Sequence, residues 1–225
     1  MEEFKYIEIL IEDKSGEILC RQIMDKYKMT VKEFGYDIHG FKGIGKIPTK
    51  IKKTTQIKTK RLLSDLPLYL TGIGNRLKNM PYKTAIFVIL DCDDEDCVEL
   101  KKSLVKMYNQ LEIDTNVVFC IAIEEMEAWL LGDKEAVQRA FPSAKQQLLQ
   151  KYVPDSIVGT WEKLADIVYK GGVRELRKNA TSYYEIGLFK CECAKKIGME
   201  LDIRKNESPS FNYFVGKLDE FCEVK

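Results

Sequence analysis

The stretch that decides the fold is T-A-I-F-V-I-L at residues 84–90, which is followed at once by D-C-D-D at residues 91–94. The seven residues are apolar or β-branched without interruption, as in a central strand that is covered on both faces. A second run of this kind, N-V-V-F-C-I-A-I, occupies residues 116–123. Two such strands with a helical pattern between them predict a parallel sheet with helices on its faces.

Strands and helices alternate through the first half of the chain. We expect further strands over 4–11 and 36–41, a helix that Ser15 caps, a helix over 61–80 with Pro67 inside or at a kink, and a helix over 94–110. After Glu124 only helices are expected, over 125–131, 133–140, 144–152, 161–169, 189–197 and 210–221, with Ser208 and Pro209 opening the last.

The predicted fold class is therefore α/β, with a small parallel sheet flanked by helices and a helical C-terminal elaboration. We expect an α/β core over residues 1–135 and a helical part over residues 136–225 that packs on it to make one compact unit.

Composition excludes several classes of protein. The 225 residues include 36 Lys and Arg against 35 Asp and Glu, and 45% are apolar, which argues against disorder. No apolar run approaches the ~20 residues of a membrane span. The acidic start, M-E-E-F, is unlike a signal peptide, so we expect a cytoplasmic protein. Seven cysteines without a C-x-x-C pair, and one histidine, argue against a zinc site and predict reduced thiols.

Carboxylates follow two of the expected strands. Glu12 comes after the first, and Asp91 and Asp93 come after the central one. Ligands of an open parallel sheet bind beyond the carboxyl ends of its strands, and alternation along an extended chain would point Asp91 and Asp93 to the same side. Carboxylates forced together repel, and Mg²⁺ or Mn²⁺ would compensate them, which suits phosphoryl chemistry. The alternative is that acidic residues here cap the next helix.

A third acidic group, E-E-M-E at residues 124–127, follows the next strand. On a helix, Glu124 and Glu127 would share a face while Glu125 would point elsewhere, so the three would not all bind one ion. The alternative is an ordinary charged first helical turn.

A basic strip lies between the second strand and the next helix. Residues 41–61 carry eight Lys and Arg and no acid, and the candidates for contact with nucleic acid are Lys42, Lys46, Lys50, Lys52 and Lys53. The alternative is a solvated loop, and G-I-G-K at residues 43–46 lacks the spacing of a phosphate-binding P-loop. His39 is a candidate to orient a phosphate or a water, or else a satisfied structural residue.

Five motifs in order carry a resemblance to a known family. They are E-D-x-S at 12–15, H-G-F-K-G-x-G-K at 39–46, D-x-D-D at 91–94, E-M-E-A-W-L-L-G-D at 125–133 and S-P-S-F at 208–211. Together they resemble a TOPRIM-like bacterial family, domain of unknown function 4276, over nearly the whole chain. Asp13 departs from the pattern, because TOPRIM proteins usually have glycine after the first acidic residue.

The resemblance implies the small parallel sheet of topoisomerases, primases and overcoming-lysogenization-defect nucleases. It implies that Glu12 acts as general acid/base or metal ligand and that Asp91 and Asp93 bind Mg²⁺. Glu125 and Glu127 match an acidic group for a second metal, and Lys190 matches a lysine that would stabilise phosphate charge. Relatives also imply a role in phage defence with an ATPase partner.

We therefore expect a Mg²⁺-dependent nuclease or phosphodiesterase that acts on nucleic acid, with DNA the expected polymer and no membrane involved. One alternative is a non-catalytic TOPRIM subunit that binds an ATPase, which Asp13 in place of glycine motivates. Another is hydrolysis of a small phosphate ester or nucleotide. The sequence leaves strand preference and oligomeric state open.

Overall fold

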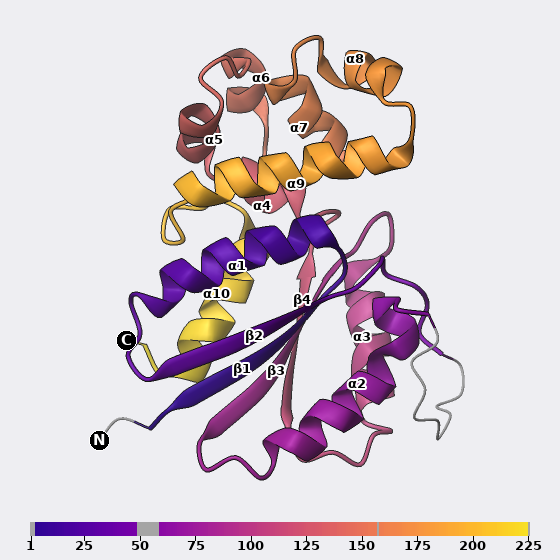
Figure 1. The fold of residues 1–225 in the computed structure, drawn as a ribbon, viewed down its shortest axis with the longest axis vertical. Coiled ribbons are helices and arrows are strands. Elements are labelled where there is room, and N and C mark those ends of the chain that lie inside the picture. The colour runs from indigo at the N-terminus through magenta and orange to yellow at the C-terminus, as the bar shows by residue number, and fades with distance from the viewer. Residues whose placement is uncertain (1–2, 49–58, 157, 225) are drawn as a thin grey trace.

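The computed structural model describes residues 3–48, 59–156 and 158–224 (Figure 1). Four strands, β1 (Lys5–Ile11), β2 (Phe34–Gly40), β3 (Lys83–Asp91) and β4 (Asn116–Ala122), form one sheet in the order β2-β1-β3-β4. All the pairings are parallel. The expected small parallel sheet flanked by helices is confirmed, and the central position of residues 84–90 explains why that stretch is apolar throughout.

Side chains alternate between two buried faces of the sheet. One face carries Ile9, Phe87 and their neighbours, and α1 (Lys14–Lys28) and α10 (Pro209–Cys222) cover it. The other face carries Val88 and its neighbours beneath α2 (Leu62–Leu77) and α3 (Cys97–Tyr108). Helices therefore cover both faces of the sheet, and its central strands are shielded from solvent.

Of the helices that the structure describes, six lie beyond the carboxyl ends of the strands, at the top of Figure 1. They are α4 (Glu127–Leu131), α5 (Lys134–Ala140), α6 (Gln146–Lys151), α7 (Thr160–Val168), α8 (Gly172–Asn179) and α9 (Tyr183–Glu200). No helix that the structure describes has both the length and the apolar character needed to span a membrane.

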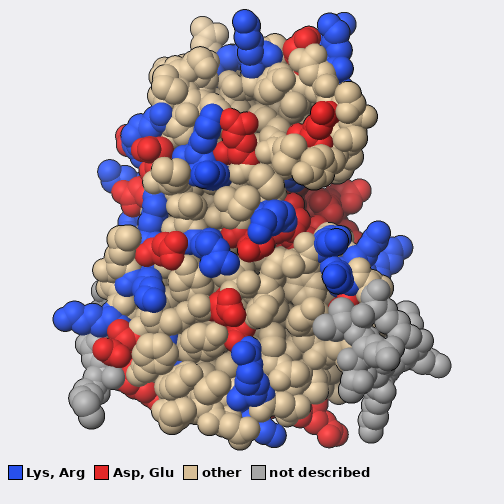
Figure 2. Space-filling model, viewed as in Figure 1, with Lys and Arg blue, Asp and Glu red and all other residues tan. Residues whose placement is uncertain are grey.

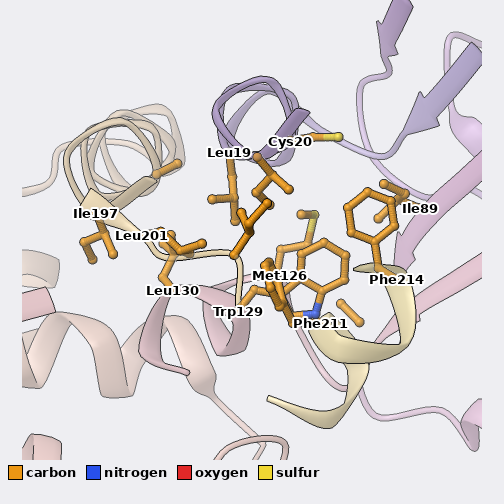
Figure 3. Close-up of a cluster of buried hydrophobic side chains, with 14 of the residues drawn as sticks. Leu19, Cys20, Ile89, Met126, Trp129, Leu130, Ile197, Leu201, Phe211 and Phe214 are labelled. Carbon is orange, nitrogen blue, oxygen red and sulfur yellow. The ribbon is translucent and has the colours of Figure 1, made fainter. Parts of the chain in front are cut away.

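The C-terminal helices share one hydrophobic cluster with the sheet. Trp129 is fully buried and stacks on Phe214, with 5.3 Å between ring centroids. Figure 3 shows Leu19 of α1 and Ile197 of α9 in the same cluster, with Ile89 of the central strand at its far side. The C-terminal segment therefore contributes to the core, since α10 returns from the helical layer to cover the sheet.

Two helices differ from their predicted extents. The sequence analysis missed α8, because Val173 and Leu176 are its only large apolar side chains. The helix predicted over 189–197 is α9, which begins earlier, at Tyr183. The prediction missed its first turn because Tyr183 and Tyr184 are exposed there and form no buried apolar stripe.

Helix starts also differ in part from the prediction. Asp13, not Ser15, caps α1: its Oδ1 accepts the Gly16 N–H at 2.7 Å, which leaves Ser15 in the first turn. Asp96 caps α3 by accepting the N–H groups of residues 98 and 99. Ser208 caps α10 as predicted, with Pro209 in the first turn.

We predict that Phe214→Ala destabilises the protein by about 3–5 kcal/mol, because the ring is fully buried between Trp129 and Phe87 and its loss leaves a cavity. The matched control is Tyr213→Ala one residue earlier, which removes a partly exposed ring and is expected to cost about 1 kcal/mol or less. Urea unfolding measures both. Equal losses for the two variants would mean that α10 does not cover the sheet as described.

Candidate active site at the carboxyl ends of the strands

The two central strands end at the point where the sheet reverses its order. β1 pairs with β2 on one side and with β3 on the other, and the helices that follow β1 and β3, α1 and α3, lie on opposite faces of the sheet. In open α/β sheets this switch point is the usual ligand site. Glu12 follows β1 and Asp91 ends β3, and the backbone N–H of Asp91 donates to Glu12 Oε2 at 3.2 Å. The predicted neighbourhood of Glu12 and Asp91 is therefore present.

Asp91 also joins the end of β3 to the segment after β4, because its Oδ1 accepts the N–H of Met126 at 3.0 Å. Asp93 lies past the strand with φ +48°, and its N–H donates to the carbonyl of Glu124 at 2.8 Å. The extended conformation that the predicted alignment of Asp91 and Asp93 assumes is absent, because the strand ends at Asp91 and Asp93 is left-handed. Asp93 is exposed, whereas Asp91 is half-buried.

The third acidic group, residues 124–127, does not lie on one helix. Glu124 has φ +65° and precedes α4, which begins at Glu127, so the prediction that Glu124 and Glu127 share a helical face is wrong. The buried Glu124 carboxylate accepts a hydrogen bond from the Thr160 hydroxyl. Glu125 Oε2 accepts the N–H of Trp161 at 2.9 Å. The start of α7 therefore orients Glu124 and Glu125.

The ammonium group of Lys190 lies against Glu125 and Glu127. Its Nζ lies 3.2 Å from Glu127 Oε2 and 3.7 Å from Glu125 Oε1. The lysine side chain, on the middle of α9, is 16% exposed. Burial opposes its charge, but Glu127, Glu125, Asp91 and Asp13 together raise the pKa of Lys190. The structure thus groups Lys190 with Glu125 and Glu127, and its charge also acts on Asp91 and Glu12.

The carboxylates of this site are reluctant to ionise. Burial, with a contribution from the nearby charge of Asp93, raises the pKa of Glu12 to about 7. Burial likewise raises the pKa of Glu127 to about 7. Burial, and to a smaller extent repulsion from Glu12, raises the pKa of Asp91. Glu125 also has a raised pKa because of burial. One ammonium therefore compensates the acidic cluster only in part.

The basic strip begins beside this cluster. The N–H of Gly43 donates to the carbonyl of Glu12 at 3.0 Å, and the N–H of Lys42 donates to the carbonyl of Lys60 at 2.9 Å. Gly43 has φ +97°, a conformation that glycine adopts without strain. Lys42, Lys46, Lys60 and Arg61 are exposed. The structure thus attaches the strip to the backbone of Glu12, whereas Lys50, Lys52 and Lys53 lie outside the described residues.

Figure 2 shows acidic side chains where the C-terminal helices meet the sheet core, with Lys and Arg around them. This mixture of signs suits a site that binds a cation at its centre and a polyanion at its rim.

His39 belongs to a different group. Among the residues that the structure describes, the only three His, Cys, Asp or Glu side chains with ligand atoms within 4.8 Å of one another are Glu8, Asp37 and His39. Glu8 is fully buried and already satisfied: Tyr6 and Arg76 donate to its Oε1, and His39 Nε2 lies 2.6 Å from its Oε2. The hydrogen bond to Glu8 raises the pKa of His39. These contacts favour the structural interpretation of His39.

The sequence analysis did not select Glu124 as a site residue, and it had no signal for Thr160 or the backbone of Trp161. Only its position directly after an apolar strand could have indicated that Glu124 belongs to the site. The roles of Thr160 and Trp161 depend on the docking of α7, which pattern alone does not give.

Comparisons with known proteins give one match. The family described as "Domain of unknown function (DUF4276)" matches residues 11–219, which spans all the site residues named above. No curated protein and no solved structure matches the chain. The acidic strand ends, Lys190 and the helical layer thus fall within one family domain, and the chain belongs to the DUF4276 family.

Proposed function

We propose that this protein is a Mg²⁺- or Mn²⁺-dependent nuclease of TOPRIM type, which hydrolyses phosphodiester bonds in nucleic acid, with DNA the expected polymer. The observation that carries the proposal is the convergence of acids from three strand ends and Lys190 at the switch point of the sheet. A basic loop attached to the backbone of Glu12 adds a surface for phosphates at the same place.

The donor set fits a hard divalent cation. Glu127 Oε2 is buried and accepts no hydrogen bond of good geometry from the described residues, although Lys190 Nζ lies 3.2 Å away. Carboxylate oxygens are the ligands that Mg²⁺ prefers. Glu12, Asp91 and Asp93 would hold one ion, and Glu125 and Glu127 would hold a second. Since these acids do not form a group of three within 4.8 Å, binding an ion would draw them together.

A bound cation would polarise the scissile phosphate and favour ionisation of water. The protein groups have separate tasks. Glu12, with a pKa near neutrality, would transfer the proton of the attacking water. Lys190 would offer positive charge to the phosphoryl oxygens. Lys42, Lys46, Lys60 and Arg61 would contact the backbone of the polymer without reading its sequence.

The role of Asp13 supports the catalytic proposal over the non-catalytic alternative. Asp13 accepts the N–H of Gly16 and the hydroxyl of Ser15, so it replaces the usual glycine with a helix cap and leaves Glu12 beside Asp91. Assembly with an ATPase in phage defence remains part of the proposal, and it rests on the resemblance to TOPRIM-like proteins and on no contact in the structure.

We predict that, without divalent cations, the free energy of unfolding falls as pH rises from about 5 to about 8. The raised pKa values of Glu12 and Glu127 mean that the folded chain binds more protons than the unfolded chain in this window, so stability is lost as pH rises. His39, whose pKa is also raised, has the same sign. Glu127→Gln should reduce the fall by roughly 2 kcal/mol. Urea unfolding across this range measures it, and a flat or rising wild-type profile would contradict it.

We predict that Mg²⁺- or Mn²⁺-dependent cleavage of single- or double-stranded DNA or RNA is lost by about 10²-fold or more in Glu12→Gln and in Asp91→Asn. The matched control is Glu95→Gln, an exposed acid of the same loop, which should keep the wild-type rate. Gel assays with a panel of labelled substrates measure the rates. Wild-type cleavage that survives both Glu12→Gln and Asp91→Asn would overturn the proposal.

A further inference from the structure

A long apolar groove lies at the free edge of β4, away from the candidate active site. α3 and α10 cover opposite faces of the sheet and flank this edge (Figure 1). The groove between them has a volume of about 800 Å³. Its walls come from Val98 and Val105 of α3, Ile121 and Ile123 at the end of β4, and Pro209 and Tyr213 of α10. None of the candidate catalytic acids lines it.

Three apolar or aromatic side chains of this groove are exposed to solvent. Val98 is 56% exposed, Val105 is 40% exposed and Tyr213 is 38% exposed. Val98 and Val105 are seven residues apart, so they lie on one face of α3 and form a stripe along it. Exposed apolar side chains gathered along a groove suit contact with the apolar face of a partner.

The charged residues that line the groove are all lysines. Lys101, Lys102 and Lys106 line it, and no Asp or Glu is among its lining residues. Lys102 pairs with Glu99 at 2.7 Å on the outer side of α3. The aliphatic stems of the lysines extend the apolar wall, and their ammonium groups form its rim. A binding partner that complements this surface must be apolar at its centre and acidic at its border.

One contact decides between a strand and a helix as the occupant. Lys101 Nζ donates to the Tyr213 hydroxyl at 2.7 Å and lies 4.4 Å from the centre of that ring. This contact connects α3 to α10 across the edge of β4, so an added strand could not run along the whole edge. The groove instead follows α3, whose 12 residues span about 18 Å, the length of a helix of three to four turns.

We propose that this groove binds an acidic amphipathic helix of a partner protein. Leucine-like side chains spaced i, i+3, i+4 and i+7 on that helix would occupy the space between Val98, Val105 and Ile123. Glu and Asp on its flanks would face Lys101, Lys102 and Lys106. The proposal does not depend on the proposed nuclease activity, because it involves no residue of the acidic cluster.

The test uses two synthetic helical peptides of the same length, with leucines at the same positions and either glutamate or lysine on the flanks. Fluorescence anisotropy measures binding to the full chain, and methyl NMR of Ile121 and Ile123 locates it. We expect the glutamate peptide to bind at least about tenfold tighter than the lysine peptide and to shift both methyl signals. Lys102→Glu with Lys106→Glu should weaken binding about tenfold or more, and Val105→Asp should abolish it.

The matched controls are Lys195→Glu and Val153→Asp, which change exposed residues outside the groove and should bind the glutamate peptide like the wild type. Thermal melting checks that each variant folds, and Val98→Asp replaces Val105→Asp if the latter does not. Equal affinity for both peptides, no binding, or binding that the groove variants leave unchanged would overturn the proposal. So would a wild-type dimer that Val105→Asp converts to monomer, because the occupant would then be a second copy.

Discussion

The site depends on the contact between one buried ammonium and the acids that surround it. Lys190 lies within 4 Å of Glu125 and Glu127, and its charge also acts on Glu12 and Asp91. Buried like charges repel strongly, and removal of one partner from a buried ion pair typically costs about 3–5 kcal/mol. The position of α9 over the strand ends therefore favours the ionised form of these acids. The helical layer is part of the site because it supplies the only cation among the described residues that contacts Glu127.

The exposed lysines of the basic strip lie outside the acidic cluster. The Gly43 N–H bonds to the carbonyl of Glu12, which fixes the start of the basic strip at the rim of the acidic cluster. Exposed lysines interact with a polyanion at long range and mainly through its phosphates. The buried Lys190, in contrast, acts on the buried carboxylates next to it, where the effective dielectric constant is low. Under the proposed function, the buried cation would serve the chemistry and the exposed ones would serve binding of the polymer.

Much of the fold could be predicted from the sequence, because residues 84–90 and 116–123 are apolar without interruption and only a parallel sheet covered on both faces accommodates such strands. Glu12 and Asp91 could be placed together for the same reason. The prediction failed where single backbone conformations decide: left-handed Asp93 and Glu124 end the strand pattern, and Asp13 caps α1 in place of Ser15. The contact of Lys190 with Glu127 joins distant segments, so only the family resemblance pointed to Lys190.

The central claim is that the acids at the strand ends form a cation site for phosphoryl chemistry. The most direct measurement is calorimetric titration of Mg²⁺ or Mn²⁺ into the wild type and into the Asp91→Asn/Asp93→Asn double variant, with and without DNA. We expect saturable binding to the wild type that the double variant loses. No binding to the wild type in either condition, or equal binding to both proteins, would contradict it.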